Sequence, residues 1–100
     1  MSKLERNVKK DICKYLDSVP DLYWERREAI GTSYKKGVPD LFAVYKGYHI
    51  EIETKREEGG KLSTMQEKFV TKCKKYGMIY ILADKVDDVR NLITKIDLVK

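Results

Sequence analysis

The chain has 100 residues with a formal net charge of +5, and 42% of its residues are hydrophobic while 37% are charged. These values predict a single globular domain covering residues 1–100, and they exclude an intrinsically disordered chain. No apolar run approaches the roughly 20 residues of a membrane helix and the N-terminus lacks a signal-peptide core, so we expect a cytoplasmic protein without membrane contact.

The first predicted element is an amphipathic helix. Apolar residues recur at intervals of three or four between positions 4 and 16, Ser2 can cap the helix, and Pro20 ends it. Glu5 lies at the margin of the apolar stripe, from which it could reach a site on a neighbouring sheet. Lys9 is expected to extend toward solvent.

The aromatic run 22–27 follows as the first predicted strand. The segment 28–37 after it contains glycines and the adjacent lysines Lys35 and Lys36, which predicts a loop. Backbone amides and lysines in such a loop suit contacts with nucleic-acid phosphates.

The next predicted element, an antiparallel hairpin, organises the rest of the chain. The sequence YKGY at 45–48 is typical of a tight turn between two β-rich runs, the second of which ends at Lys55. If the first and last residues of this turn face each other, counting outward places Asp40 opposite Glu53, with Cβ atoms about 4.5–5.5 Å apart. Lys55 leaves the strand on the same face as Glu53, because side chains alternate along a strand.

The second half of the chain predicts a helix, a strand and a helix after a polar loop at 56–61. Ser63 and Gln66 match a capping box, and Gly77 ends the helix that they begin. The apolar run 78–83 predicts a strand that is buried on both faces and paired in parallel. The order α-β-β-β-α-β-α predicts an α/β fold with a mixed central sheet flanked by helices. Also predicted are hairpin strands at 41–45 and 48–55, a single helix stripe of Met65, Phe69, Cys73 and Tyr76, and a last helix capped by Asp84 with Val86, Val89, Leu92, Ile93 and Ile96 inward.

The predicted pairing of Asp40 with Glu53 has a chemical consequence. Two carboxylates that face each other are destabilising unless a cation lies between them. Mg²⁺ suits this position, because it takes oxygen ligands and usually only one or two protein carboxylates. Such an ion would activate a water and stabilise the leaving oxygen of a phosphodiester, while Lys55 would hold or activate that water. These residues therefore predict hydrolysis of a nucleic-acid backbone.

Asp40 followed by Glu-Thr-Lys at 53–55, with a glutamate on the first helix, resembles the PD-(D/E)XK nuclease superfamily. The sequence GVPDL at 37–41 and the sequence GKLSTMQ at 60–66 resemble its VRR-NUC branch in particular. The resemblance runs from about Glu5 to the last helix. It implies a restriction-endonuclease-like fold and a site for Mg²⁺ or Mn²⁺.

The resemblance also implies roles for individual residues. Asp40 and Glu53 would be metal ligands, the Thr54 carbonyl a further ligand, and Lys55 the catalytic lysine. Glu5 would support the metal directly or through water, and Gln66 would orient the lysine or the water. Nucleic-acid contacts are expected from four lysines, Lys9, Lys35, Lys36 and Lys61.

Several of these residues have a second interpretation. Gln66 is explained by the capping box without catalysis, and Glu5 by an ion pair with Lys9 on an exposed helix face. Glu51, which the family pattern does not contain, could bind a second metal or pair with His49 or a lysine. A single histidine rules out a zinc site of the usual ligand spacing, and Cys13 and Cys73 are expected to be free thiols.

The predicted function is a structure-selective DNA endonuclease, and members of this branch are similar to homodimeric enzymes that resolve Holliday junctions. Phage replication, recombination or DNA repair would fit such an activity. Two alternatives stay open. One is an inactive nucleic-acid-binding protein on the same fold, and the other is a small structural or regulatory subunit whose charges all lie on the surface.

Overall fold

The computed structural model describes residues 5–27, 37–54 and 62–100, without the side chains of residues 5 and 6. Its elements follow the predicted order, α-β-β-β-α-β-α. Among the described helices, none is both long and apolar enough to cross a bilayer. The elements are α1 (Glu5–Ser18), β1 (Leu22–Arg26), β2 (Leu41–Tyr45), β3 (Tyr48–Thr54), α2 (Thr64–Tyr76), β4 (Ile79–Ala83) and α3 (Val86–Val99).

The four strands form one mixed sheet in the order β1-β2-β3-β4. The first three are antiparallel neighbours, and β4 pairs in parallel with β3. The hairpin has the predicted register, from Tyr45 opposite Tyr48 to Leu41 opposite Ile52. Its turn places Lys46 and Gly47 at φ of 49° and 85°, the left-handed conformations of a two-residue hairpin turn. The predicted mixed α/β architecture and hairpin register are therefore confirmed.

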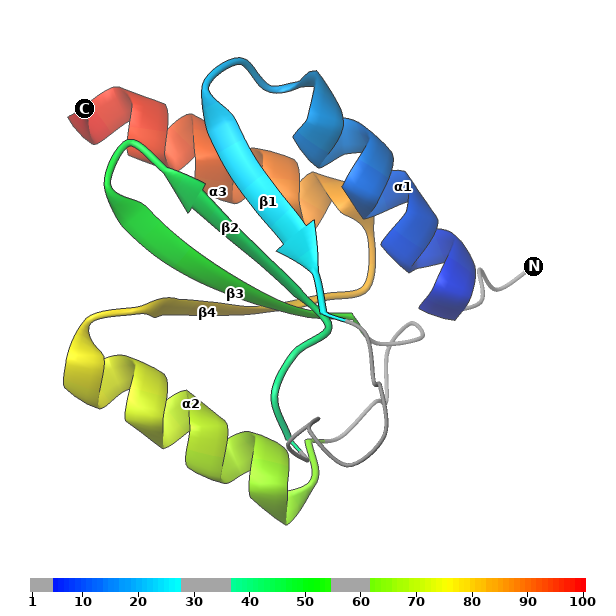
Figure 1. Ribbon diagram of the computed structural model, residues 1–100, viewed down its shortest axis with the longest axis vertical. Coiled ribbons are helices and arrows are strands. Elements are labelled where there is room, and N and C mark those ends of the chain that lie inside the picture. The colour runs from blue at the N-terminus through cyan, green and yellow to red at the C-terminus, as the bar shows by residue number, and fades with distance from the viewer. Residues whose placement is uncertain (1–4, 28–36, 55–61) are drawn as a thin grey trace.

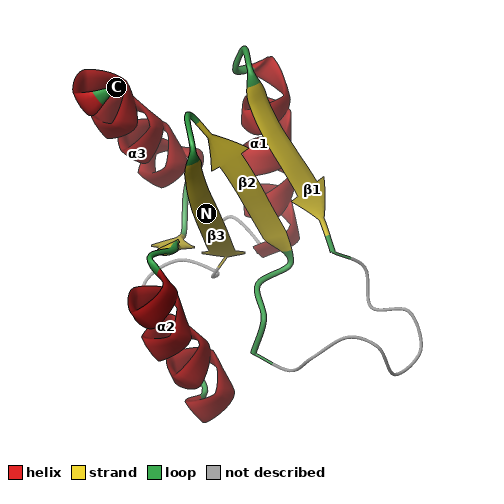
Figure 2. Ribbon diagram, turned by 60° about the vertical axis from the view of Figure 1, so that its left-hand side comes forward, coloured by secondary structure: helices red, strands yellow, loops and turns green. Residues whose placement is uncertain are grey.

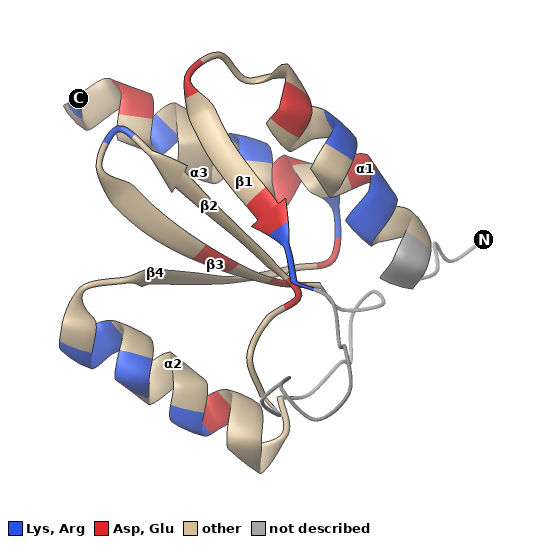
Figure 3. Cartoon of the chain, in the orientation of Figure 1, with Lys and Arg blue, Asp and Glu red and all other residues tan. Residues whose placement is uncertain are grey.

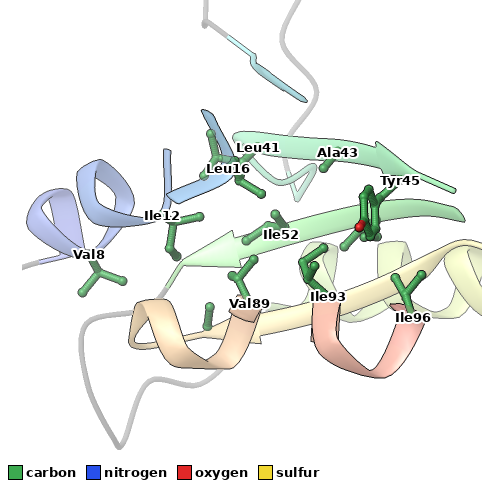
Figure 4. Packing of buried hydrophobic residues seen from close by; sticks show 12 residues of the cluster. Val8, Ile12, Leu16, Leu41, Ala43, Tyr45, Ile52, Val89, Ile93 and Ile96 are labelled. Carbon is green, nitrogen blue, oxygen red and sulfur yellow. The ribbon is translucent and has the colours of Figure 1, made fainter. Parts of the chain in front are cut away.

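Helices α1 and α3 cover one face of the sheet, and α2 lies against the other face (Figures 1 and 2). The hydrophobic core fills the space between the sheet and helices α1 and α3 (Figure 4). Alternate strand residues enter this core, which leaves the intervening residues of β2 and β3 on the α2 side. The core consists of Val8, Ile12, Leu16, Leu41, Ala43, Tyr45, Ile50, Ile52, Ala83, Val89, Ile93 and Ile96.

The predicted stripe of α2 is only partly buried. Cys73 is buried, but Met65 and Tyr76 are 45% and 66% exposed, and Phe69 is half-buried against Tyr80 with ring centroids 6.2 Å apart. The reason is that α2 packs over β4, one strand of the sheet, so most of its apolar face has no partner within the described chain. The predicted ends of this helix are confirmed by its complete capping box and its left-handed C-cap glycine.

Two predictions for the C-terminal third are wrong. Strand β4 is the edge of the sheet, so its residues are mostly half-buried and not buried on both faces. Asp84 does not cap α3. The N-cap is Lys85, which makes no side-chain capping bond, and the carboxylate of Asp88 reaches back to accept from the Asp84 N–H at 3.0 Å.

The close contact between Gly37 and α2 leads to a stability prediction. Gly37 has φ of +86°, and an added Cβ would lie 2.6 Å from the carbonyl carbon and oxygen of Met65. Gly47 has nearly the same φ but open space around it. We expect Gly47→Ala to cost about 1–2 kcal/mol through the left-handed conformation alone. Gly37→Ala should cost about 1–3 kcal/mol more because the backbone of α2 must move.

Urea unfolding of both variants measures this difference, with the wild type as reference. Equal destabilisation by the two substitutions would show that the contact of Gly37 with α2 does not constrain the folded chain.

Candidate active site

The ends of β1 and β3 and the start of β2 meet at one end of the sheet, where charges of both signs gather (Figure 3). Asp40 directly precedes β2, and continuing the hairpin register by one pair places it opposite Glu53. The β1 pairing also continues by one step, because the Arg27 N–H donates to the Asp40 carbonyl at 2.6 Å. Asp40 is thus held in strand-like pairing although β2 begins only at the next residue.

The carboxylate of Asp40 forms an ion pair with Lys9 of α1. The side chain of Lys9 is 13% exposed and that of Asp40 is 38% exposed. The expectation that Lys9 extends into solvent is therefore wrong, and its ammonium instead neutralises part of the negative charge at the end of the sheet. The chain itself supplies a cation at the carboxylate that was expected to attract one.

A buried charge network lies on the α2 side of the sheet, beside this pair. Glu51 is 1% exposed, and the guanidinium of Arg27 binds it through two parallel bonds of 2.7 Å. His49 Nε2 lies 2.6 Å from the same carboxylate, stacked on Phe42 with ring centroids 5.5 Å apart. The guanidinium carbon of Arg27 lies over the ring of Phe42, 4.7 Å from the ring centroid. Of the alternatives considered for Glu51, the pairing with His49 is observed, and Arg27 is a second partner that binds through two bonds.

Arg27 connects this network to Asp40. One of its terminal nitrogens, Nη1, donates to the Pro39 carbonyl at 2.8 Å as well as to Glu51. Together with the backbone bond from Arg27 to Asp40, this makes two anchors on consecutive residues before β2. The side chain of Arg27 therefore ties the segment that carries Asp40 to Glu51, two residues before Glu53 on β3.

Sequence reasoning missed Arg27, although a signal was present. Glu51 lies on β3, an interior strand between β2 and β4, where a side chain on either face is covered, and a buried carboxylate needs a cation. The register of β1 against β2 places Arg27 opposite Asp40, within reach of that carboxylate. The β1–β2 register, however, depends on a loop whose length gives no such information.

Tyr80 of β4 lies beside the acidic residues of β3. It lies opposite Glu51 in the parallel pairing of β3 and β4. Its hydroxyl is buried and has no hydrogen-bond partner among the described residues. Burial, followed by the negative charge of Glu53, raises the pKa of this phenol well above its usual range. Tyr80 therefore places a neutral hydroxyl beside the acidic residues of β3.

The donors at the end of the sheet fit a hard divalent cation. Asp40 and Glu53 supply two carboxylates from neighbouring strands, and both residues are only half-buried, which leaves room for water ligands. This matches Mg²⁺, which commonly uses one or two carboxylates and keeps several waters. Within the described ranges, no group of three or more histidine, cysteine or acidic side chains could hold an ion alone. Glu51 is engaged by Arg27, which disfavours the second-metal role considered for it.

The structure describes some of the other predicted site residues and not the rest. Gln66 completes the capping box, with its Oε1 accepting from the Ser63 N–H at 2.7 Å. Thr54 is the last residue of β3 and is buried, and Glu5 begins α1. Lys35, Lys36, Lys55 and Lys61, and the side chain of Glu5, lie outside the described residues.

Two solved structures have the same fold. One, a "VRR_NUC domain", matches with a TM-score of 0.73 and 19% identity over 92% of this chain and 96% of its own. The other, a "VRR_NUC domain protein", matches with a TM-score of 0.78 and 18% identity over 95% of this chain and 88% of its own. The sequence itself matches no protein-family model and no curated protein. The expected VRR-NUC-like fold is thus confirmed at the level of structure.

Proposed function

We propose that this protein is a metal-dependent DNA endonuclease of the VRR-NUC type. The observation that carries the proposal is the register that sets Asp40 opposite Glu53 at one end of the sheet, in a chain with the fold of VRR_NUC domains. The net charge of +5 suits a nucleic-acid substrate. Substrate DNA would lie across the end of the sheet where these two residues meet.

The proposed roles follow from the chemistry of each group. Asp40 and Glu53 hold Mg²⁺ or Mn²⁺, with the Thr54 carbonyl as a further oxygen donor. The bound ion supplies charge neutralisation at the scissile phosphate and lowers the pKa of an attacking water. Lys55 positions that water and offsets the negative charge that develops on the phosphate. Glu5 supports the site through water.

Gln66 is proposed to help orient Lys55 in addition to its capping role. The support for this is that Gly37, three residues before Asp40, packs against the backbone of Met65 in the first turn of α2. That contact brings the start of α2 to the segment that carries Asp40.

The proposed substrate is branched DNA, such as a Holliday junction, cut by a homodimer with one site for each strand. Sedimentation velocity with and without a four-way junction tests the assembly. A monomer that only nicks single strands would contradict the junction-resolving part of this proposal and leave the nuclease part intact.

A second function is favoured by one observation. The ammonium of Lys9 already neutralises Asp40, so the fold has a stable charge arrangement without a metal. A nucleic-acid-binding protein without catalysis would need no more than this.

Cleavage of a substrate panel separates the two functions. Labelled four-way junction, flap, nicked duplex and linear duplex are incubated with the protein in Mg²⁺ or in EDTA. We expect cleavage in Mg²⁺ and no cleavage in EDTA. Binding of these DNAs without cleavage in either condition would support the inactive binding protein, and absence of both would reject a role in nucleic-acid chemistry.

A further inference from the structure

A cavity of about 420 Å³ opens between α1 and the end of β1. Its volume is within the range of small-ligand sites. The cavity is lined by residues from two turns of α1 and from the last position of β1, namely Asn7, Lys9, Lys10, Cys13 and Arg26.

The charge of this cavity is one-sided. Three of its lining side chains are cationic, and none of the lining residues that the structure describes is acidic. Burial raises the pKa of the Cys13 thiol, and the charges of Arg26 and Lys9 act against this rise, so both cations lie close enough to influence the cavity wall. Such a cavity selects an anion.

The cavity borders the candidate active site. Lys9 lines it and also contacts the carboxylate of Asp40. Arg26 lies opposite Leu41 in the β1–β2 pairing, and Leu41 directly follows Asp40 in the chain. An anion in the cavity therefore lies one side chain away from the proposed metal ligands.

We propose that this cavity binds a backbone phosphate of the substrate strand, adjacent to the phosphate that is cleaved. The proposal rests on the proposed nuclease function and adds a defined path for the DNA strand, from the start of β2 across α1. Arg26 offers a guanidinium for two-point contact with phosphate oxygens, Lys10 a second charge, and Asn7 an amide donor. None of these groups reads a base, so the subsite is independent of sequence.

Cys13 provides a direct probe of this cavity, and Cys73 is its internal control because it is fully buried. N-ethylmaleimide labelling of each thiol is followed by peptide mass spectrometry, in EDTA so that no strand is cut. With duplex DNA at about ten times its Kd, we expect labelling of Cys13 to slow about tenfold, as mass action requires for a covered site. Inorganic phosphate at the same total phosphate concentration should give no protection.

A pair of double variants tests the cations. Lys10→Ala/Arg26→Ala should weaken DNA binding by about 10- to 100-fold, the range for two lost charge-assisted contacts. It should also reduce the slope of log affinity against log salt by about 2. Lys85→Ala/Lys95→Ala removes the same charge from exposed positions at the start and middle of α3, and should change affinity much less.

Three results would overturn the assignment. DNA that binds without slowing the labelling of Cys13 would place the strand elsewhere and leave the proposed function intact. Protection by inorganic phosphate alone would make the cavity a site for free anions. A wild-type protein that binds no DNA at all would reject both the subsite and the proposed function.

Discussion

Lys55→Ala should lower the rate constant of DNA cleavage by about 10²- to 10⁴-fold, the usual contribution of one general acid or base. The variant should bind Mn²⁺ as the wild type does, because Lys55 is proposed to act on the water and the phosphate and not on the ion. Single-turnover cleavage measures the rate, and isothermal titration calorimetry of Mn²⁺ measures the affinity.

Asp40→Asn is the matched variant, because it changes one proposed ligand with little change in shape. We expect Mn²⁺ affinity to fall by about 10- to 100-fold or more. The loss of an outer-shell partner of a metal ion costs about that much, and the loss of a direct ligand should cost no less. Cleavage should fall with it. The two variants thus give different patterns, and Lys55→Ala cleaving at the wild-type rate would assign the activation of water to another group.

Asp40→Asn also removes the charge that Lys9 neutralises, which makes Lys9→Met a necessary control. If Lys9 and the ion compete for the same carboxylate, Lys9→Met should bind Mn²⁺ at least as tightly as the wild type in the absence of DNA. A loss of Mn²⁺ affinity in Lys9→Met would show that the lysine supports the ion site and does not compete with it.

The hairpin could be predicted from the sequence because its register is local. A two-residue turn at Lys46 and Gly47 fixes which residues face each other, and the pairing of Asp40 with Glu53 follows by counting. The capping box at Ser63 and the terminal Gly77 were predictable for the same reason, since each is decided by neighbours along the chain.

The features that could not be predicted depend on tertiary contacts. The periodicity of α2 shows which of its faces is apolar, but not that the helix would cover a single edge strand and leave Tyr76 exposed. The preference of Asp for N-cap positions favours Asp84, yet the exit of the chain from β4 places Lys85 there. Arg27 and Glu51 are 24 positions apart, and the need of a buried carboxylate for a cation does not by itself say which cation supplies it.

That pair is the subject of the second large prediction. Arg27→Met should lower the free energy of unfolding by about 3–5 kcal/mol, because it leaves the carboxylate of Glu51 buried without its main counter-charge. His49 retains its bond to this carboxylate, which favours the lower half of that range. The exposed pair of Arg90 and Asp87 is the control, and Arg90→Met should cost about 1 kcal/mol or less.

The double variant Arg27→Met/Glu51→Leu separates stability from positioning. Replacing both partners of a buried ion pair with apolar groups is often neutral or stabilising, so urea unfolding should return close to the wild-type value. The Pro39 carbonyl still loses its bond from the Arg27 side chain, while Asp40 keeps its backbone bond from residue 27 and its ion pair with Lys9. We therefore expect Mn²⁺ affinity and cleavage to remain reduced in a chain that is as stable as the wild type.

A double variant that is stable, binds Mn²⁺ normally and cleaves at the wild-type rate would show that Arg27 only balances the charge of Glu51. The opposite pattern, restored stability with weak ion binding, has a physical reason. Two carboxylates hold one small ion only when their separation is fixed, and Glu53 is fixed by its place in a strand between two neighbours. Asp40 lies before its strand begins, so its position depends on its ion pair with Lys9 and on Arg27, which bonds to both residues of the Pro39-Asp40 segment.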